Sequence, residues 1–443
     1  MSSHADDTPT FNLKAVVQET GLTPDTLRAR ERRYGLPTPE RSQGRHRLYS
    51  QRDIDILKWL NARQDEGLTI SRAVDLWRKL EVDGKDPLEE LMGAETTGFP
   101  APVMGPALVE LKQAWVNACL LFDEAQAEHV LSQAFALYTP ETVLLEVMRR
   151  GLVHIGEEWH AGNVSAQQEH FASELSMRRL EVMIGATNPT RTGRILIACP
   201  PDESHTFSPL LINFLLRRQG WRTIFLGANV PLTRFEATLA QARPNLIIFS
   251  AQQLHTAATL ADLADAVSPM RIPVGFGGLI FTLMPNLTKR IAGHYLGDSI
   301  DHVAPAVERL LASPPPLPAP VLLPAGYAAA MEHYLDKRSI LGARVWDLLQ
   351  DMSATLHPLY FSIANTYLAQ NIYAALRLGS MDFLSADMAW IEGLLYERQI
   401  PRQALVAYMQ AYTQAATEVL DARGEPIVAW LRNLVASSNT RSH

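Results

Sequence analysis

Hydrophobic positions in the middle of the chain follow the pattern of buried strands alternating with helices. The run Ile195 to Ala198 is short, rich in β-branched residues and closely followed by prolines, whereas Pro209 to Arg218 has helical periodicity. Further short apolar runs end at Gly227, Ser250 and Gly277. The pattern predicts an α/β domain with a parallel sheet over residues 192–312.

Helical periodicity dominates on both sides of this α/β region. Residues 107–186 contain four helical patterns separated by loop signals, which predicts a four-helix bundle. Residues 325–436 are also helical throughout, with breaks near Gly379, Pro401 and Gly424. The Gly, Pro and acid-rich stretch 83–106 is expected to be a linker, and the proline-rich stretch 313–324 a stiff spacer.

The N-terminal region, residues 10–80, has the pattern of two short helices joined by a tight turn. Thr23 suits a helix cap and Pro24 the first helical position, so the second helix is expected to run to about Arg33. Eight arginines against two acids lie between Arg28 and Arg52. Such a cluster can neutralise phosphates and give salt-dependent affinity for double-stranded DNA.

The order of these signals resembles the winged helix-turn-helix of MerR-type regulators, with a helix from Thr26 to Gly35 and a wing around Arg45 to Tyr49. In that family the helix reads bases and the wing grips the DNA backbone. The resemblance implies base contacts from Arg28, Arg32 and Arg33 and backbone contacts from Arg45, His46 and Arg47, with Tyr34 and Tyr49 interleaved. Relatives often have an aromatic residue where this chain has Arg30, which predicts a different operator preference. The alternative is a merely solvated basic face.

Composition limits the classes of protein that fit. At 443 residues and 47% hydrophobic content, the chain has room for about three domains with proper cores. No apolar run approaches the ~20 residues of a membrane span and the N-terminus is polar, so a cytoplasmic protein without a membrane partner is expected. Cys119 and Cys199 are too few for a disulfide framework or a four-cysteine metal site. The net charge of −7 places any DNA contact on a local patch.

Polar and glycine residues follow each predicted strand of the α/β domain. They are Glu203-Ser204-His205, Leu226-Gly227, Phe249-Ser250-Ala251 and Phe276-Gly277-Gly278. Ligands bind beyond the carboxyl ends of parallel strands, so a loop histidine there can meet a cofactor. The alternative is a satisfied loop histidine in an ordinary doubly wound domain.

The strand-end set resembles a cobalamin-binding Rossmann domain. The resemblance implies that His205 replaces the cofactor's own lower base and ligates cobalt, that Glu203 and Gly227 belong to the cofactor site, and that Ser250, Gly277 and Gly278 line the nucleotide tail. The family usually has glycine three residues after the histidine, whereas this chain has Ser208. The added Cβ predicts an altered lower face.

Two pairs in the bundle concentrate polar and aromatic groups near one helix junction. Trp159-His160 ends the third helical pattern and Glu169-His170 opens the fourth. An indole can stack on a flat ligand while the polar groups hydrogen-bond its edge. The alternative is a core tryptophan with solvated polar neighbours.

Placed before a cobalamin domain, these pairs resemble CarH-type light-responsive regulators, in which a bundle caps adenosylcobalamin. The resemblance implies that Trp159 packs against the upper ligand and that Glu169 and His170 contact the adenosyl group. His160 would ligate cobalt once that group is lost. It also implies that light breaks the cobalt–carbon bond, a homo-oligomer dissociates and DNA is released, with no catalytic turnover. The alternatives are a cobalamin-dependent enzyme or methyl carrier, which would need a barrel-sized partner domain, and a regulator that senses without cobalamin.

The C-terminal region is rich in aromatic residues and is expected to form an all-α, globin-like domain. It resembles the bilin-binding half of photocobilins, which implies biliverdin. Arg344, Arg377, Arg398 and Arg402 are available for its propionates, and attachment would be non-covalent because neither cysteine lies in this region. Two alternatives stay open: a helical dimerisation domain with an aromatic core, and a haem held by His333 or His357.

Overall fold

The computed structural model describes residues 11–41, 47–65, 68–82, 87–88, 106–313, 315–316, 318, 322–351, 358–384 and 402–440. The chain divides into two compact units, Met1–Ala172 and Ser173–His443. Helices dominate both units, and the second also contains a five-stranded parallel sheet. The mixed α and α/β fold predicted from the sequence is therefore confirmed.

The N-terminal region folds as a helix-turn-helix with a small antiparallel sheet. Its two helices are α1 (Leu13–Thr20) and α2 (Pro24–Tyr34), and the Thr23 side chain caps α2 by accepting a hydrogen bond of 3.2 Å from the Thr26 N–H. Gly35 closes α2 in a left-handed conformation with φ +68°. The predicted cap and the first helical proline are both confirmed.

The sheet of this region has the order β1-β3-β2, formed by β1 (Phe11–Asn12), β3 (Arg47–Tyr49) and β2 (Glu40–Arg41). Two longer helices follow, α3 (Gln51–Asp65) and α4 (Ile70–Val82). A small core of buried side chains joins the elements, consisting of Val16, Leu27, Tyr49, Ile54 and Leu57. Because α2 and β3 share this core, the recognition helix and the base of the wing are held together.

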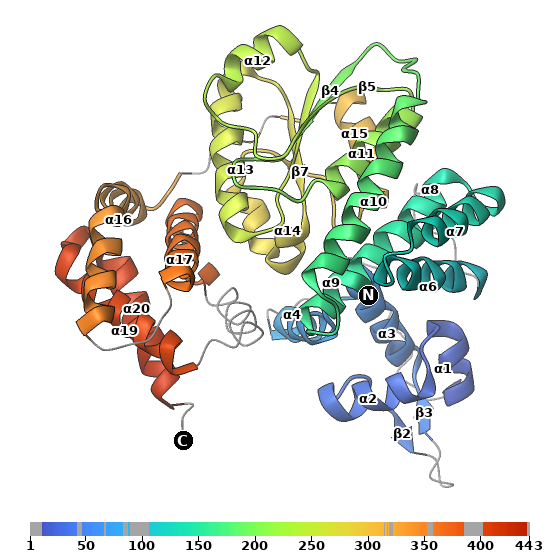
Figure 1. Cartoon of the computed structure of the whole chain (residues 1–443), viewed down its shortest axis with the longest axis horizontal. Helices are drawn as coiled ribbons and strands as arrows, with labels where there is room; N and C mark the ends of the chain where they lie inside the picture. The colour runs from blue at the N-terminus through green and yellow to red at the C-terminus, as the bar shows by residue number, and fades with distance from the viewer. Residues whose placement is uncertain are drawn as a thin grey trace, which may run out of the picture. The chain divides into compact units, whose positions relative to one another are not determined.

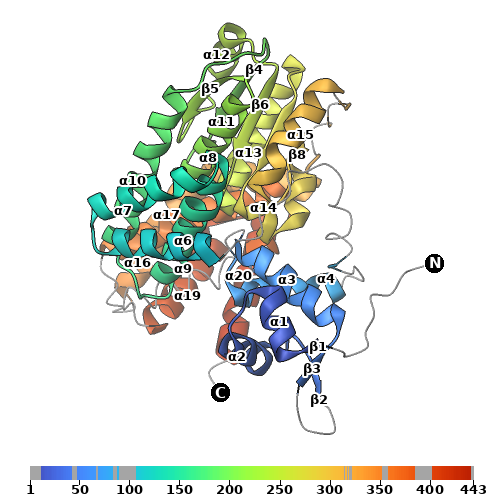
Figure 2. The same ribbon diagram turned by 90° about the vertical axis from the view of Figure 1, so that its right-hand side faces the viewer.

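The bundle region consists of consecutive helices joined by short turns (Figure 2). They are α6 (Pro106–Leu120), α7 (Glu124–Leu137), α8 (Pro140–Thr142), a π-helical stretch (Val143–Arg149), α9 (Arg150–His160) and α10 (Ala166–Gly185). The breaks near residues 122 and 139 lie where the sequence predicts loops. The π-helical stretch was not predicted, and such stretches occur often at functional sites.

The α/β domain contains the sheet, whose strand order is β5-β4-β6-β7-β8 with all pairs parallel. The strands are β4 (Arg194–Ala198), β5 (Arg222–Gly227), β6 (Leu246–Ser250), β7 (Val274–Gly277) and β8 (His294–Tyr295). The order reverses between β4 and β6, so the loops that follow these two strands flank the crevice where such folds bind ligands.

Helices cover both faces of the sheet (Figure 1). They are α11 (Phe207–Arg218), α12 (Phe235–Ala242), α13 (Leu254–Val267), α14 (Leu279–Leu283) and α15 (Ile300–Ala312). Ile195 and Ile197 pack with α11 and α15 on one face, whereas Leu196 and Ala198 share a core with α12 and α13 on the other. This alternation is typical of a buried strand in a doubly wound sheet.

The C-terminal region is helical where it is described. Its helices are α16 (Ala325–Asp351), α17 (Pro358–Leu378), α19 (Arg402–Val419) and α20 (Glu425–Thr440). The predicted breaks after Leu378 and before Glu425 are confirmed, whereas the break at Pro401 lies outside the described residues. Most of the predicted linker 83–106, the wing residues Arg45 and His46, and His357 also lie outside them. Within the described part of the chain, no helix is both long and apolar enough to cross a membrane.

Candidate functional site

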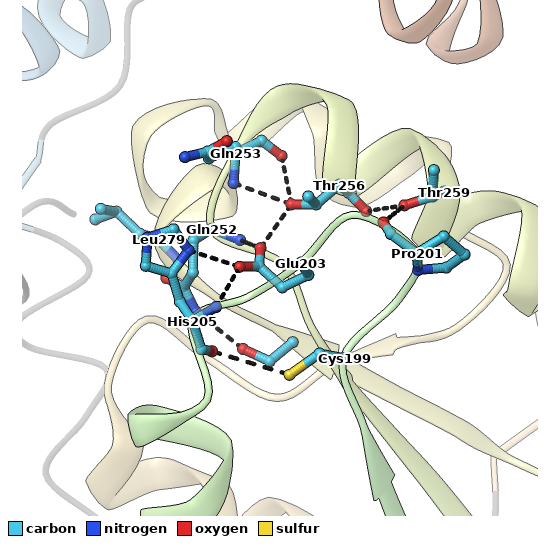
Figure 3. Close-up of polar contacts among 10 residues, drawn as sticks. Cys199, Pro201, Glu203, His205, Gln252, Gln253, Thr256, Thr259 and Leu279 are labelled. Carbon is cyan, nitrogen blue, oxygen red and sulfur yellow. Dashed lines mark hydrogen bonds and ion pairs between the residues drawn. The ribbon is translucent and has the colours of Figure 1, made fainter. Parts of the chain in front are cut away.

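The loop after β4 places a buried carboxylate at the ligand crevice (Figure 3). Glu203 has a side chain that is 1% exposed, and its Oε1 accepts hydrogen bonds from the His205 backbone N–H at 2.9 Å and from His205 Nδ1 at 2.6 Å. Its Oε2 accepts from the Gln252 N–H at 2.7 Å and from the Thr256 hydroxyl at 2.8 Å. Four donors from two loops and one helix thus fix this carboxylate.

The same hydrogen bonds fix the chemical form of His205. Burial by itself would raise the pKa of Glu203, but the hydrogen bonds and charge of His205 outweigh it and hold that pKa below its usual range. An ionised carboxylate only accepts hydrogen bonds, so His205 Nδ1 donates, and whenever the ring is neutral its lone pair lies on Nε2. Metal-binding histidines have this arrangement, with a carboxylate on the nitrogen opposite the metal. The side chain is 58% exposed, and this donor set fits cobalt.

The ends of β6 and β7 lie next to the His205 loop, and together these segments form what we call the lower site. Gln252 donates from Nε2 to the Ser250 hydroxyl at 3.0 Å and accepts at Oε1 from the Leu279 N–H at 3.0 Å, which ties the two loops together. Gly278 has φ +123°, and a Cβ there would lie 1.9 Å from the Ala251 carbonyl oxygen. Only glycine permits this backbone approach. The loop after β7 therefore lies against the backbone that follows Ser250, which is itself buried.

The sequence reasoning missed two residues of this network, Gln252 and Thr256. Thr256 is 1% exposed and lies in the first turn of α13, where its hydroxyl also accepts from the Gln253 N–H at 3.1 Å. The sequence did offer one signal for Thr256: it is a hydroxyl residue in the first turn of the helix that follows the third strand of the domain. Glu203, which the sequence places in the cofactor site, is buried and hydrogen-bonds His205, and its role toward a cofactor stays a prediction. Ser208 lies half-buried in the first turn of α11, and its effect on the lower face stays a prediction.

The two residue pairs of the helical bundle, here called the bundle group, lie at the junction of α9 and α10. They are Trp159-His160 and Glu169-His170. Trp159 and His160 contact each other with ring centroids 4.7 Å apart, and His170 Nδ1 lies 3.5 Å from Glu169 Oε2. Partial burial lowers the pKa of His160, which favours the neutral imidazole that a metal requires. The structure therefore brings each pair together and places both beside one loop. That loop is anchored where Gln168 Nε2 donates to the Leu120 carbonyl at 2.7 Å.

The candidate DNA surface is centred on α2. Arg28, Arg32 and Arg33 are exposed, as their predicted base contacts require. Glu31 joins the wing to this helix, because Arg47 Nε donates to its Oε2 at 2.7 Å and the Tyr49 hydroxyl donates to its Oε1 at 2.6 Å. The clamp leaves the base of the wing fixed against the recognition helix.

Two predictions about DNA contacts need correction. Tyr49 is 0% exposed and bonds Glu31, so it positions the wing instead of contacting DNA. Arg30 is 7% exposed and donates to Asn61 Oδ1 at 2.9 Å and to Gln64 Oε1, so it joins α2 to α3 and cannot alter operator preference by direct contact. In both cases a polar tip is satisfied inside the domain, which periodicity does not reveal.

Several residues of the C-terminal region that were predicted to bind a pigment or a haem already form contacts with other side chains or with the backbone. Arg344 Nε lies 2.6 Å from Glu418 Oε2, and Arg377 binds Asp262 and Asp265 of the α/β domain. His333 is 3% exposed, and its Nε2 accepts a hydrogen bond of 3.1 Å from the Asp421 N–H. These contacts favour structural roles for the three residues, and His333 Nε2 is not placed to ligate a haem.

The described aromatic residues of this region largely pack against one another. Tyr334 and Tyr412 are buried with their hydroxyls 3.0 Å apart, and Trp346 contacts Phe361 with ring centroids 4.9 Å apart. Such contacts are typical of a core. They account for much of the aromatic density without a ligand.

Comparison with known families assigns three segments. A MerR HTH family regulatory protein matches residues 11–80, and B12 binding domains match residues 111–183 and 193–299. The two B12-binding matches contain the bundle group and the His205 loop, respectively. A MerR-type helix-turn-helix followed by B12-binding domains makes this chain a cobalamin-binding transcription regulator.

Two curated relatives align with this chain over most of their own length. The HTH-type transcriptional repressor CarH of Myxococcus xanthus is 29% identical over 290 residues, which is 64% of this chain and 94% of CarH. The repressor CarA of the same organism is 29% identical over 282 residues, 61% of this chain and 87% of CarA. The arrangement fits a CarH-type regulator.

Proposed function

We propose that this chain is a light-dependent repressor that binds adenosylcobalamin and operator DNA as a homo-oligomer. The observation that carries the proposal is the hydrogen bond of 2.6 Å between His205 Nδ1 and Oε1 of the buried Glu203 at the ligand crevice. When bound, adenosylcobalamin supplies a cobalt–carbon bond that light breaks. His205 would hold the cofactor from below, with Ser250, Gly277 and Gly278 around its nucleotide tail.

The bundle group supplies the part of the protein that distinguishes dark from light. Trp159 would pack on the upper ligand, and Glu169 and His170 would hydrogen-bond its polar edge. His160 would ligate the metal once the upper ligand is lost, and the lowered pKa of its imidazole favours the neutral form that a metal binds. No catalytic step is required of any residue. The runner-up, a methyl carrier or cobalamin enzyme, has no use for the DNA-binding region.

Absorbance and DNA binding of the purified protein test this proposal together. With adenosylcobalamin in the dark, we expect the protein to assemble and to bind its operator, and illumination should change the spectrum, the mass and the DNA affinity. A protein that binds adenosylcobalamin but keeps all three properties under light would be a regulator without a light response. The cytoplasmic location stays a prediction.

The DNA surface is tested by a matched pair of arginines. Arg28→Ala should cost about 1–3 kcal/mol at one operator position and relax sequence preference, because it removes a base contact. Arg45→Ala should weaken binding about equally to operator and random DNA and reduce the salt slope by about one. Gel-shift titrations on both DNAs measure this. Equal losses on both DNAs from Arg28→Ala would remove that residue from the base contacts.

We also propose that residues 325–436 bind biliverdin without a covalent bond. Arg344 and Arg377 already form ion pairs with carboxylates of the protein. The propionates would therefore pair with Arg398 and Arg402, whose side chains lie outside the described residues. Co-expression of the full chain with a haem oxygenase should give a red absorption band that Arg398→Ala and Arg402→Ala weaken. A colourless protein that still self-associates through this region would identify it as a dimerisation domain.

A further inference from the structure

Helix α17 of the C-terminal region packs along α13, the helix whose first turn supplies Thr256 to the Glu203 network. The two helices contribute to one hydrophobic cluster, with Leu260 and Leu263 from α13 and Leu368 and Ile372 from α17. Both helices belong to the second compact unit. The C-terminal region is therefore joined directly to an element of the cobalt-ligand support.

A charged clamp fixes the far end of this contact. Arg377 is 7% exposed, and its guanidinium donates from Nε to Asp262 Oδ1 at 2.5 Å and from a terminal nitrogen to Asp265 Oδ2 at 2.5 Å. The Tyr373 hydroxyl donates to the other oxygen of Asp262 at 2.6 Å. The two aspartates lie three residues apart on one face of α13. One guanidinium thus pairs with both carboxylates and fixes the rotation of α13 against α17.

The other end of the contact reaches the loop that carries His205. Gln370 Nε2 lies 3.4 Å from Oδ2 of Asp202, the residue before Glu203. The Tyr367 ring lies edge-on to His255, with centroids 6.2 Å apart, and His255 is the residue before Thr256. From Tyr367 to Arg377, α17 therefore contacts both segments whose donors surround Glu203.

We propose that Arg377 is a positioning residue for the cobalt ligand, which acts by anchoring α17 on α13. Anchoring keeps Thr256 against Glu203 and the 199–206 loop against the helix, and so holds His205 in the geometry that a metal needs. The inference rests on the proposed role of His205 and requires no pigment in the C-terminal region. It gives that region a function in the cobalamin site itself.

Hydrogen exchange and cobalamin binding on the full chain test this role. The variants are Arg377→Met and Gln370→Ala, with Arg423→Gln as the matched control, because Arg423 pairs with Asp421 inside the C-terminal region at 2.7 Å. Without cofactor, Arg377→Met should raise amide exchange in residues 199–206 and 254–259. It should also weaken binding of hydroxocobalamin by about tenfold, the usual effect of losing an outer-shell support. Gln370→Ala should change both in the same direction by a smaller factor, and the control should change neither.

The outcomes separate this inference from the proposed function. Unchanged exchange and affinity in Arg377→Met would overturn the inference even if His205 ligates cobalt. A rise in exchange throughout the chain, with no excess in the two segments, would also overturn it by showing general destabilisation. Gln370→Ala removes only one contact at the surface, so it reports on the loop even if Arg377→Met folds poorly. If the spectrum of bound cobalamin were the same in His205→Ala as in the wild type, His205 would not be the cobalt ligand. The exchange data would still report whether α17 holds the loop.

Discussion

The loop after β4 and the junction of α9 and α10 present their histidines in different ways. His205 is held by a carboxylate that is 1% exposed and that receives four hydrogen bonds. In the junction, Glu169 is 33% exposed and His170 79% exposed, and Trp159 contacts His160 through ring packing. The first site is fixed by a buried network, whereas the second is made of surface side chains.

The difference suits two roles within one regulator. A ligand that must stay in place benefits from a support whose rotamers are locked before binding, because little conformational entropy is then lost on binding. A group that must respond to the loss of an upper ligand needs side chains that can change position at low cost. The comparison predicts large effects on affinity from the lower site and small effects on dark affinity from the upper one.

The largest effect is expected from removing the lower ligand. His205→Ala should weaken cobalamin binding by more than about 100-fold, beyond the range of outer-shell changes, because the metal–nitrogen bond itself is lost. Titration monitored by absorbance measures the affinity, and the spectrum of the bound cofactor should lose its histidine-ligated form. The control is His129→Ala, which changes an exposed histidine of α7 outside the proposed cofactor site. Retention of both affinity and spectrum in His205→Ala would end the assignment.

A smaller loss is expected from the carboxylate that orients the histidine. Glu203→Gln keeps the shape but removes the negative charge and lets the amide present a donor, so the His205 tautomer is no longer specified. We expect about 10- to 100-fold weaker binding of cobalamin. The same change in the upper site, Glu169→Gln, should have less than about a threefold effect on hydroxocobalamin. Equal effects in the two variants would contradict the distinction between a fixed and an adaptable site.

Removing His160 should have little effect on cofactor affinity in the dark. His160→Ala is expected to bind adenosylcobalamin in the dark within about threefold of wild type, since the proposed ligand role of His160 begins only after illumination. The illuminated variant should then lack the spectrum of cobalt held by two histidines. A dark affinity as low as that of His205→Ala would mean that His160 supports the ground state.

The smallest effect concerns acid stability. The pKa of Glu203 is depressed in the folded chain, so its contribution is present above the unfolded value of about 4.3 and is lost as the pH falls through the folded value. Without cofactor, Glu203→Gln should therefore lose less stability than wild type on acidification below about pH 4. Thermal melts across that range measure the slope. Identical slopes would show that the network around Glu203 does not favour its charged form.

Much of the architecture could be predicted because it depends on local patterns. Buried strands read as short β-branched runs, and the Thr23 cap with Pro24 marks the start of α2, since both signals follow from backbone geometry within a few residues. The strand-end positions of His205, Ser250 and Gly278 also followed, because parallel strands bring their carboxyl ends to one edge.

What the sequence determined by itself is the order of the domains, the residue types at the strand ends and the basic recognition helix. Tertiary structure decided which polar groups meet: Thr256 with Glu203, Tyr49 and Arg47 with Glu31, Arg30 with α3, and Arg377 with two aspartates over 110 residues away. The physical reason is that hydrophobic periodicity reports which face of an element is buried. Hydrogen-bond partners depend on where that face is placed, and only the packed chain specifies this.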